Sequence, residues 1–208
     1  MASLSDIKRR TAFLRPKSVS WARVVSDVIS PPVVWAIVGL MVGMRYTDSL
    51  AEGLFWAAEF GLLICLLPIV YVGFMVWRGK IGDIHMKQRK ERFIPMLITV
   101  GCAFLALSLA IQLTAPPVFV LLTFIALVQT VLMLSITLFW QISMHMMSIT
   151  AATVAVSTLF SSGLGLMLIP VIALVAAARL ELKRHTPAQV LAGTLMGGLV
   201  PTVILLML

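Results

Sequence analysis

Long apolar stretches constrain this chain more than any other feature, because each is long enough to cross a lipid bilayer as a helix. A transmembrane helix needs roughly 17–25 consecutive, mostly apolar residues. The chain is 61% hydrophobic and 12% charged, whereas a soluble domain is about 45–50% apolar. We therefore predict an all-α, polytopic transmembrane helical bundle of six to seven spans. The predicted spans are residues 27–46, 53–77, 94–113, 117–139, 146–161, 164–178 and 187–207.

The fifth and sixth predicted spans are shorter than the others. Between them lies Ser161-Ser162-Gly163, a composition typical of a turn. Two interpretations are open: two separate crossings, or one hairpin of helices that each reach only partway into the membrane. The remaining loops are too short for a large soluble domain. Residues 27–208 are therefore predicted to form a single transmembrane domain, preceded by a basic tail over residues 1–26.

Positive charge is concentrated on one face of the predicted bundle. The tail, the loop around residues 78–92 and the loop over 179–185 are separated by even numbers of spans, and together they hold every Lys and Arg except Arg45. The positive-inside rule places this face in the cytoplasm. We expect a protein integral to the cell (plasma) membrane, with a retained cytoplasmic N-terminus. The net charge of +8 then requires no nucleic-acid partner, and the expected partners are membrane lipids.

The three histidines of the chain all lie in short polar stretches between apolar spans, at His85, His145 and His185. Span parity puts all three on the same face, where Arg92 and Arg179 also lie. Such a cluster predicts a cationic pocket at the level of the lipid headgroups. Phosphate is the best candidate ligand, since the planar fork of arginine matches phosphate oxygens and helix N-termini offer free N–H groups.

Cysteine and glycine positions favour structural roles. Cys65 and Cys102 both fall inside predicted spans and lack metal-type spacing, so we expect no disulfide, no metal site and no cofactor. The spacings Gly39-x-x-x-Gly43 and Gly193-x-x-x-Gly197 are typical of helices that approach one another closely in a membrane.

Three short motifs resemble those of the type 2 phosphatidic acid phosphatase superfamily of membrane lipid phosphatases. In that family the motifs read Lys-x6-Arg-Pro, Pro-Ser-Gly-His and Ser-Arg-x5-His-x3-Asp. Their order, internal spacing and positions relative to the spans agree with this chain over roughly residues 83–193, in segments 83–93, 141–145 and 178–189. The corresponding residues are His85-x6-Arg92-Phe93, Ile142-Ser143-Met144-His145 and Ala178-Arg179-x5-His185-x3-Gln189.

The resemblance implies a lipid-phosphate phosphatase that acts on a polyprenyl diphosphate or phosphatidate-type substrate through a phosphohistidine. It implies that His185 is the nucleophile and that His145 is the general acid. Arg92, Arg179 and Ser143 would hold the phosphate oxygens. These roles agree with general chemistry, because a neutral imidazole is a competent nucleophile near pH 7.

The chain departs from the family motifs at three functional positions. His85 stands where the family has lysine, Met144 where it has glycine, and Gln189 where it has aspartate. The glutamine amide can orient His185 but brings no negative charge to it. Asp83, two residues before His85, is a candidate substitute partner for a catalytic histidine.

Simpler roles and other functions fit the same residues. Thr186-Pro187-Ala188-Gln189 is also typical of a helix capping box, and Ser143 of an N-cap. One alternative function is a non-catalytic, phosphatase-like subunit of a larger membrane complex, or a lipid-binding or transport protein. Another is a histidine that binds a metal, haem or pigment. A homo-oligomer is compatible with each of these functions.

Overall fold

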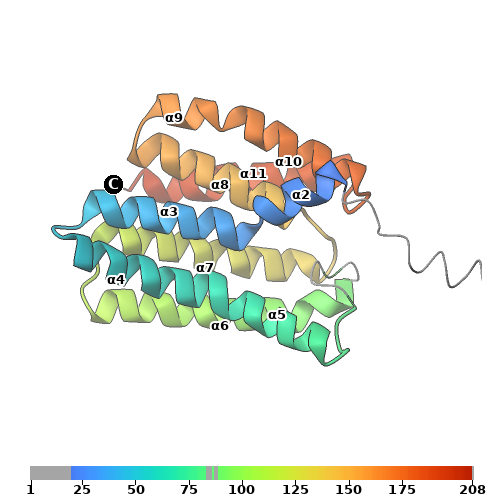
Figure 1. Ribbon diagram of the computed structural model, residues 1–208, viewed down its shortest axis with the longest axis horizontal. Helices are drawn as coiled ribbons and strands as arrows, with labels where there is room; N and C mark the ends of the chain where they lie inside the picture. Colours follow the sequence, from blue (N-terminus) through green and yellow to red (C-terminus); the bar gives the residue numbers. More distant parts are fainter. Residues whose placement is uncertain (1–19, 83–85, 87–88, 208) are drawn as a thin grey trace, which may run out of the picture.

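The computed structural model describes residues 20–82, 86 and 89–207, and within them it contains helices and no strands. The prediction of an all-α helical bundle is confirmed (Figure 1). The helices, in chain order, are α2 (Trp21–Val28), α3 (Pro31–Tyr46), α4 (Leu50–Phe60), η1 (Gly61–Leu66), α5 (Leu67–Trp77), α6 (Arg89–Gln112), α7 (Pro117–Thr137), α8 (Met144–Leu159), α9 (Ser162–Met167), α10 (Ile169–Glu181) and α11 (Pro187–Leu205).

Five helical segments of the described chain are long and apolar enough to cross a membrane, or six if α2 and α3, bent by 42°, form one span. This is close to the predicted six to seven. The sixth predicted span is longer than expected, because α9 and α10 together cover 20 residues. Helix α8, with 16 residues, is shorter than a full crossing, as is α3 unless it is joined to α2. The five segments are Leu50–Trp77, Arg89–Gln112, Pro117–Thr137, Ser162–Glu181 and Pro187–Leu205.

Local sequence signals explain where several helices begin. The hydroxyls of Ser143, Ser161 and Thr186 each accept a hydrogen bond from a backbone N–H in the first turn of α8, α9 and α11. Proline occupies the first position of α7 and of α11, where its missing N–H has no intrahelical partner to lose. These starts are therefore encoded within a few residues.

Two interruptions near the N-terminal half shape the bundle. Pro31 and Pro32 end one helical run and start the next, so α2 leaves the axis of α3 and packs against α10 instead. Helix α2 begins at Trp21, inside the segment predicted as tail. The π-helical turn η1 precedes Pro68, which has no N–H to donate to the preceding turn, and the N–H of Leu67 bonds to the carbonyl of Leu62.

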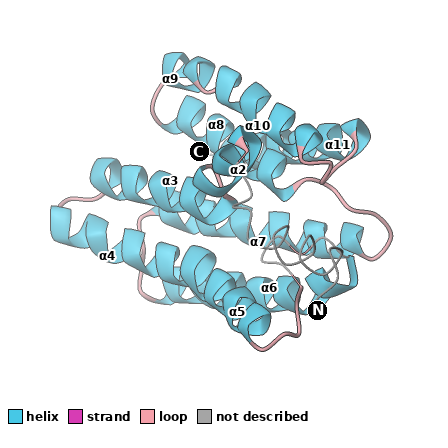
Figure 2. Cartoon of the chain, turned by 45° about the vertical axis from the view of Figure 1, so that its right-hand side comes forward, coloured by secondary structure: helices cyan, strands magenta, loops and turns pink. Residues whose placement is uncertain are grey.

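Helix α8 packs against α3, α9, α10 and α11 (Figures 1 and 2). Its close approach to α11 requires glycine. A Cβ on Gly193 would meet the carbonyl oxygen of Ser143, and one on Gly197 would meet that of Met147. Gly43 of α3 similarly faces Gly53 of α4. The glycine spacings seen in the sequence thus mark real helix contacts.

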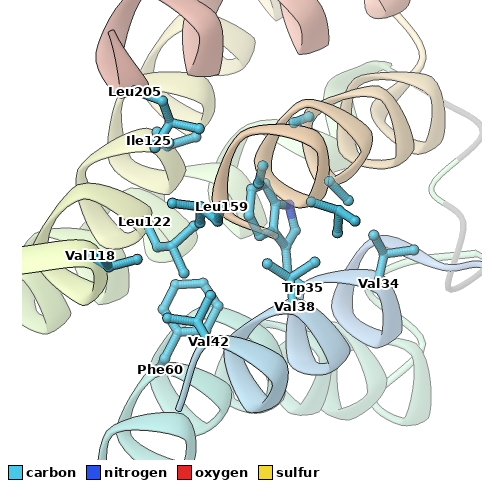
Figure 3. Packing of buried hydrophobic residues seen from close by; sticks show 14 of the residues in the cluster. Val34, Trp35, Val38, Val42, Phe60, Val118, Leu122, Ile125, Leu159 and Leu205 are labelled. Atoms are coloured by element: carbon cyan, nitrogen blue, oxygen red, sulfur yellow. The ribbon is translucent and has the colours of Figure 1, made fainter. Parts of the chain in front are cut away.

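The buried core is formed by apolar side chains from distant helices (Figure 3). Trp35 of α3 meets Phe60 of α4 edge-on, with ring centroids 6.3 Å apart, and Leu122 of α7 is fully buried beside them. Large apolar residues such as Phe104 of α6 and Val203 of α11 are each 63% exposed. An apolar surface of this kind is stable against lipid chains and unfavourable in water.

Candidate functional site

One cavity at one end of the bundle gathers four of the predicted site residues. Arg92 lies in the first turn of α6, His145 at the start of α8, Arg179 in the last turn of α10 and His185 in the turn between α10 and α11. These helix ends meet at the right-hand end of the molecule in Figure 1. All four side chains line the same cavity, whose volume is about 570 Å³. The predicted convergence on one end of the bundle is present.

The segments that carry His145 and His185 are joined by a backbone hydrogen bond. The N–H of Ser143 donates to the carbonyl of Gln189 over 3.1 Å, which ties the start of α8 to the first turn of α11. Gly193, one turn further along α11, lets the two helices remain in contact. The two imidazoles are therefore placed by one rigid helix pair.

Gln189 combines two of the roles expected from the sequence. Its side-chain oxygen Oε1 accepts from the N–H of Thr186 at 3.0 Å, while its own N–H donates to the Thr186 hydroxyl, which completes a capping box. The same Oε1 lies 3.3 Å from Nδ1 of His185. An amide oxygen only accepts hydrogen bonds, so Nδ1 carries the proton. Nε2 of His185 then holds the free lone pair.

Burial and neighbouring positive charge keep His185 neutral. Its side chain is 7% exposed, and burial is the largest cause that lowers its pKa from 6.5 to about 4. The guanidinium groups of Arg179 and Arg92 lower this pKa further, whereas the hydrogen bond to Gln189 raises it. The imidazole is thus unprotonated on Nε2 throughout the neutral pH range.

Helix α2 supplies a site residue that sequence reasoning missed. The carbonyl of Ser26 lies 3.0 Å from Nε2 of His145, and the Ser26 hydroxyl accepts from Nη1 of Arg179 at 3.3 Å. Asp27, the next residue, also lines the cavity, and its charge attracts Arg179. A sequence signal existed, since Ser20 caps a helical stretch that ends before Pro31, but it lay inside the predicted tail.

The two arginines are deeply buried yet only partly satisfied by the protein. Arg92 is 5% exposed and donates from Nε to the carbonyl of Met86 over 2.9 Å. Arg179 is 2% exposed, and its Nε has no hydrogen-bond partner among the described residues. The two guanidinium groups are close enough to repel one another electrostatically. A cavity with this charge suits an anion that carries several oxygens.

Ser143, another predicted site residue, does not line this cavity. The hydroxyl of Ser143 accepts from the N–H of Met146, and the residue is completely buried at the N-cap of α8, outside the cavity lining. His85 and Asp83 fall outside the described residues. Within the described part of the chain, no group of three or more His, Cys, Asp or Glu side chains could hold a metal ion.

Away from the charged end, the cavity wall becomes apolar. Most of the side chains there, which come from α3, η1, α5 and α7, are apolar and include Trp35, Ile64, Ile69 and Ala126; Gln129 and Thr130 of α7 also line the cavity. One end of the cavity is therefore suited to an anionic headgroup and the other to hydrocarbon. In comparisons with known proteins, the chain matches no family model, no curated protein and no solved structure.

Proposed function

We propose that this protein is an integral membrane phosphatase that removes phosphate from a lipid-linked phosphate, either a polyprenyl diphosphate or a phosphatidate-type lipid. The observation that carries the proposal is the shared cavity of Arg92, His145, Arg179 and His185. It is supported by the resemblance of their three motifs to membrane lipid phosphatases. The cavity has one cationic end and one apolar end, which is the polarity of such a substrate.

In the proposed reaction, Arg92 and Arg179 hold the phosphate oxygens by charge-assisted hydrogen bonds. Nε2 of His185 attacks phosphorus with its lone pair, and the bond from phosphorus to the leaving oxygen breaks. His145 gives a proton to that oxygen. Water then attacks phosphorus and gives a proton back to His145, the P–N bond breaks with its electron pair returning to Nε2 of His185, and inorganic phosphate leaves. Fixed positive charge is the main requirement of such a transfer, because negative charge builds on the phosphoryl oxygens.

Gln189 acts in this scheme as a positioning residue. By accepting from Nδ1–H, it turns the lone pair of Nε2 toward the cavity side of the ring. An amide oxygen stabilises the positive charge on a phosphorylated imidazole less than a carboxylate does. We therefore expect slow turnover compared with an enzyme that has aspartate at this position.

The alternative function is a lipid-binding protein of the same architecture without turnover, such as a subunit of a larger complex. The uncharged Gln189 favours it, as do the contacts of His145 and Arg179 with Ser26, which occupy groups that catalysis would use. We place the cationic end on the cytoplasmic side of the plasma membrane in both cases, because positively charged loops are retained there.

The experiment is phosphate release from phosphatidate and from a polyprenyl diphosphate by purified protein in detergent micelles. We expect release that is lost in His185→Ala and reduced at least a hundredfold in His145→Ala, since general acids contribute about 10²–10⁴-fold. Arg179→Ala is a further variant of the site. Its matched control is Arg45→Ala, because Arg45 lies at the opposite end of the bundle. Equal activity in the wild type and both histidine variants would remove the phosphatase assignment and leave lipid binding.

A further inference from the structure

Gln129 of α7 is a buried polar residue that the proposed reaction does not use. It is 1% exposed, and neither its side-chain oxygen nor its nitrogen has a hydrogen-bond partner among the described residues. It also lines the cavity that contains Arg92 and Arg179. Buried amides are nearly always hydrogen-bonded, because an unpaired one loses its interactions with water and gains none in return. An unpaired amide in a cavity wall therefore indicates a missing ligand group.

The depth of Gln129 limits what that group can be. Counted from the turn that joins α6 to α7, Arg92 lies about 30 Å and Gln129 about 18 Å along their helices, at about 1.5 Å per residue. Gln129 is therefore roughly 12 Å deeper in the bundle than Arg92. In an extended glycerol lipid, the distance from the phosphorus to an ester carbonyl oxygen, plus one hydrogen bond from that oxygen to its donor, is similar, at roughly 11 Å.

We infer that Gln129 is a specificity-determining residue that donates a hydrogen bond to a carbonyl group of a lipid phosphate, at the linkage between its headgroup and its hydrocarbon chain. The inference rests on the proposed function for the identity of the ligand as a lipid phosphate. It names acyl-linked lipid phosphates, such as phosphatidate, as the preferred class. A polyprenyl phosphate offers only hydrocarbon at this depth and leaves the amide unpaired.

The surroundings of Gln129 agree with this assignment. Thr130, the next residue, also lines the cavity, but its hydroxyl already donates to the carbonyl of Ala126 at 2.8 Å. The neighbouring wall residues Ile64 and Ala126 offer no polar side chain. The Gln129 amide thus offers an unused hydrogen-bond donor below the phosphate, and the apolar wall around it accommodates the acyl chains.

The test measures binding and does not depend on turnover. Dioctanoyl phosphatidate, its dialkyl ether analogue and farnesyl phosphate compete with a fluorescent lipid phosphate for the purified protein. We expect the wild type to bind the diester about tenfold more tightly than the diether, since a hydrogen bond to a buried amide has about this effect. Gln129→Leu and Gln129→Met should lower this ratio to about one, and Thr130→Val should leave it unchanged.

Equal binding of diester and diether to the wild type overturns the inference, whether or not the variants fold. An unchanged ratio in both Gln129 variants also overturns it, because the preference for the diester would then not depend on this amide. A preserved tenfold preference without any phosphate release contradicts the proposed phosphatase activity and leaves the role of Gln129 intact. The two proposals thus fail in different measurements.

Discussion

Replacement of Gln189 by glutamate tests the electrostatic account of His185. The carboxylate would keep the capping box, because glutamate at this helix position accepts from the N-cap N–H as glutamine does. It would also place a negative charge where Oε1 now lies, 3.3 Å from Nδ1 of His185. The pKa of His185 should therefore rise from its present value of about 4.

The size of the rise follows from the geometry. Two unit charges about 4 Å apart attract by about 4 kcal/mol at an effective dielectric constant near 20. This corresponds to roughly three pKa units, at about 1.4 kcal/mol per unit. Burial of the new carboxylate offsets part of the attraction, so we expect the pKa of His185 to rise by about two units.

Nuclear magnetic resonance of isotopically labelled histidine measures this pKa directly, because the chain has only three histidines to assign. Gln112→Glu, at the far end of α6, adds the same charge and should leave His185 unchanged. Gln189→Met should lower the pKa slightly, since it removes a hydrogen bond that now raises it. A shift of less than half a unit in Gln189→Glu would refute the contact between the two side chains.

Two further predictions concern stability. The pKa of His185 is depressed to about 4 in the folded state and is near 6.5 in the unfolded state. The free energy of unfolding is therefore unaffected by this histidine above about pH 6.5, and it falls by about 3 kcal/mol in total as the pH decreases toward 4. Thermal unfolding in detergent between pH 7 and 4 measures this loss, and His185→Gln should show a flatter profile than the wild type; parallel profiles contradict the prediction. Gly197→Ala should destabilise the protein by about 1–3 kcal/mol, because its Cβ would overlap the backbone of Met147 in α8. Gly198→Ala meets only a side-chain methyl of Thr150 at 3.9 Å and is the matched control in the same unfolding assay; equal effects of the two variants would show that α8 and α11 are not in close contact.

Span positions could be predicted because they depend on local sequence. Each apolar stretch is self-sufficient as a helix in a membrane, since its backbone hydrogen bonds close within the segment. The first predicted span begins inside the amphipathic helix α2, because α2 lacks the continuous apolar character that marks a crossing. Span parity predicted that four site residues lie at the same end of the bundle, namely Arg92, His145, Arg179 and His185. It did not predict the distances between their side chains.

The sequence alone determined the apolar spans, the N-cap at Ser143, the Thr186–Gln189 capping box and the end of the bundle at which the cationic residues lie. Only the tertiary structure decided which of these side chains share a cavity. Ser26 contacts His145 and Arg179 across 119 and 153 residues of chain, and the amide of Gln129 has no hydrogen-bond partner among the described residues. The reason is physical: helix formation depends on neighbours within a few residues, whereas burial, charge proximity and hydrogen-bond satisfaction depend on segments that only packing brings together.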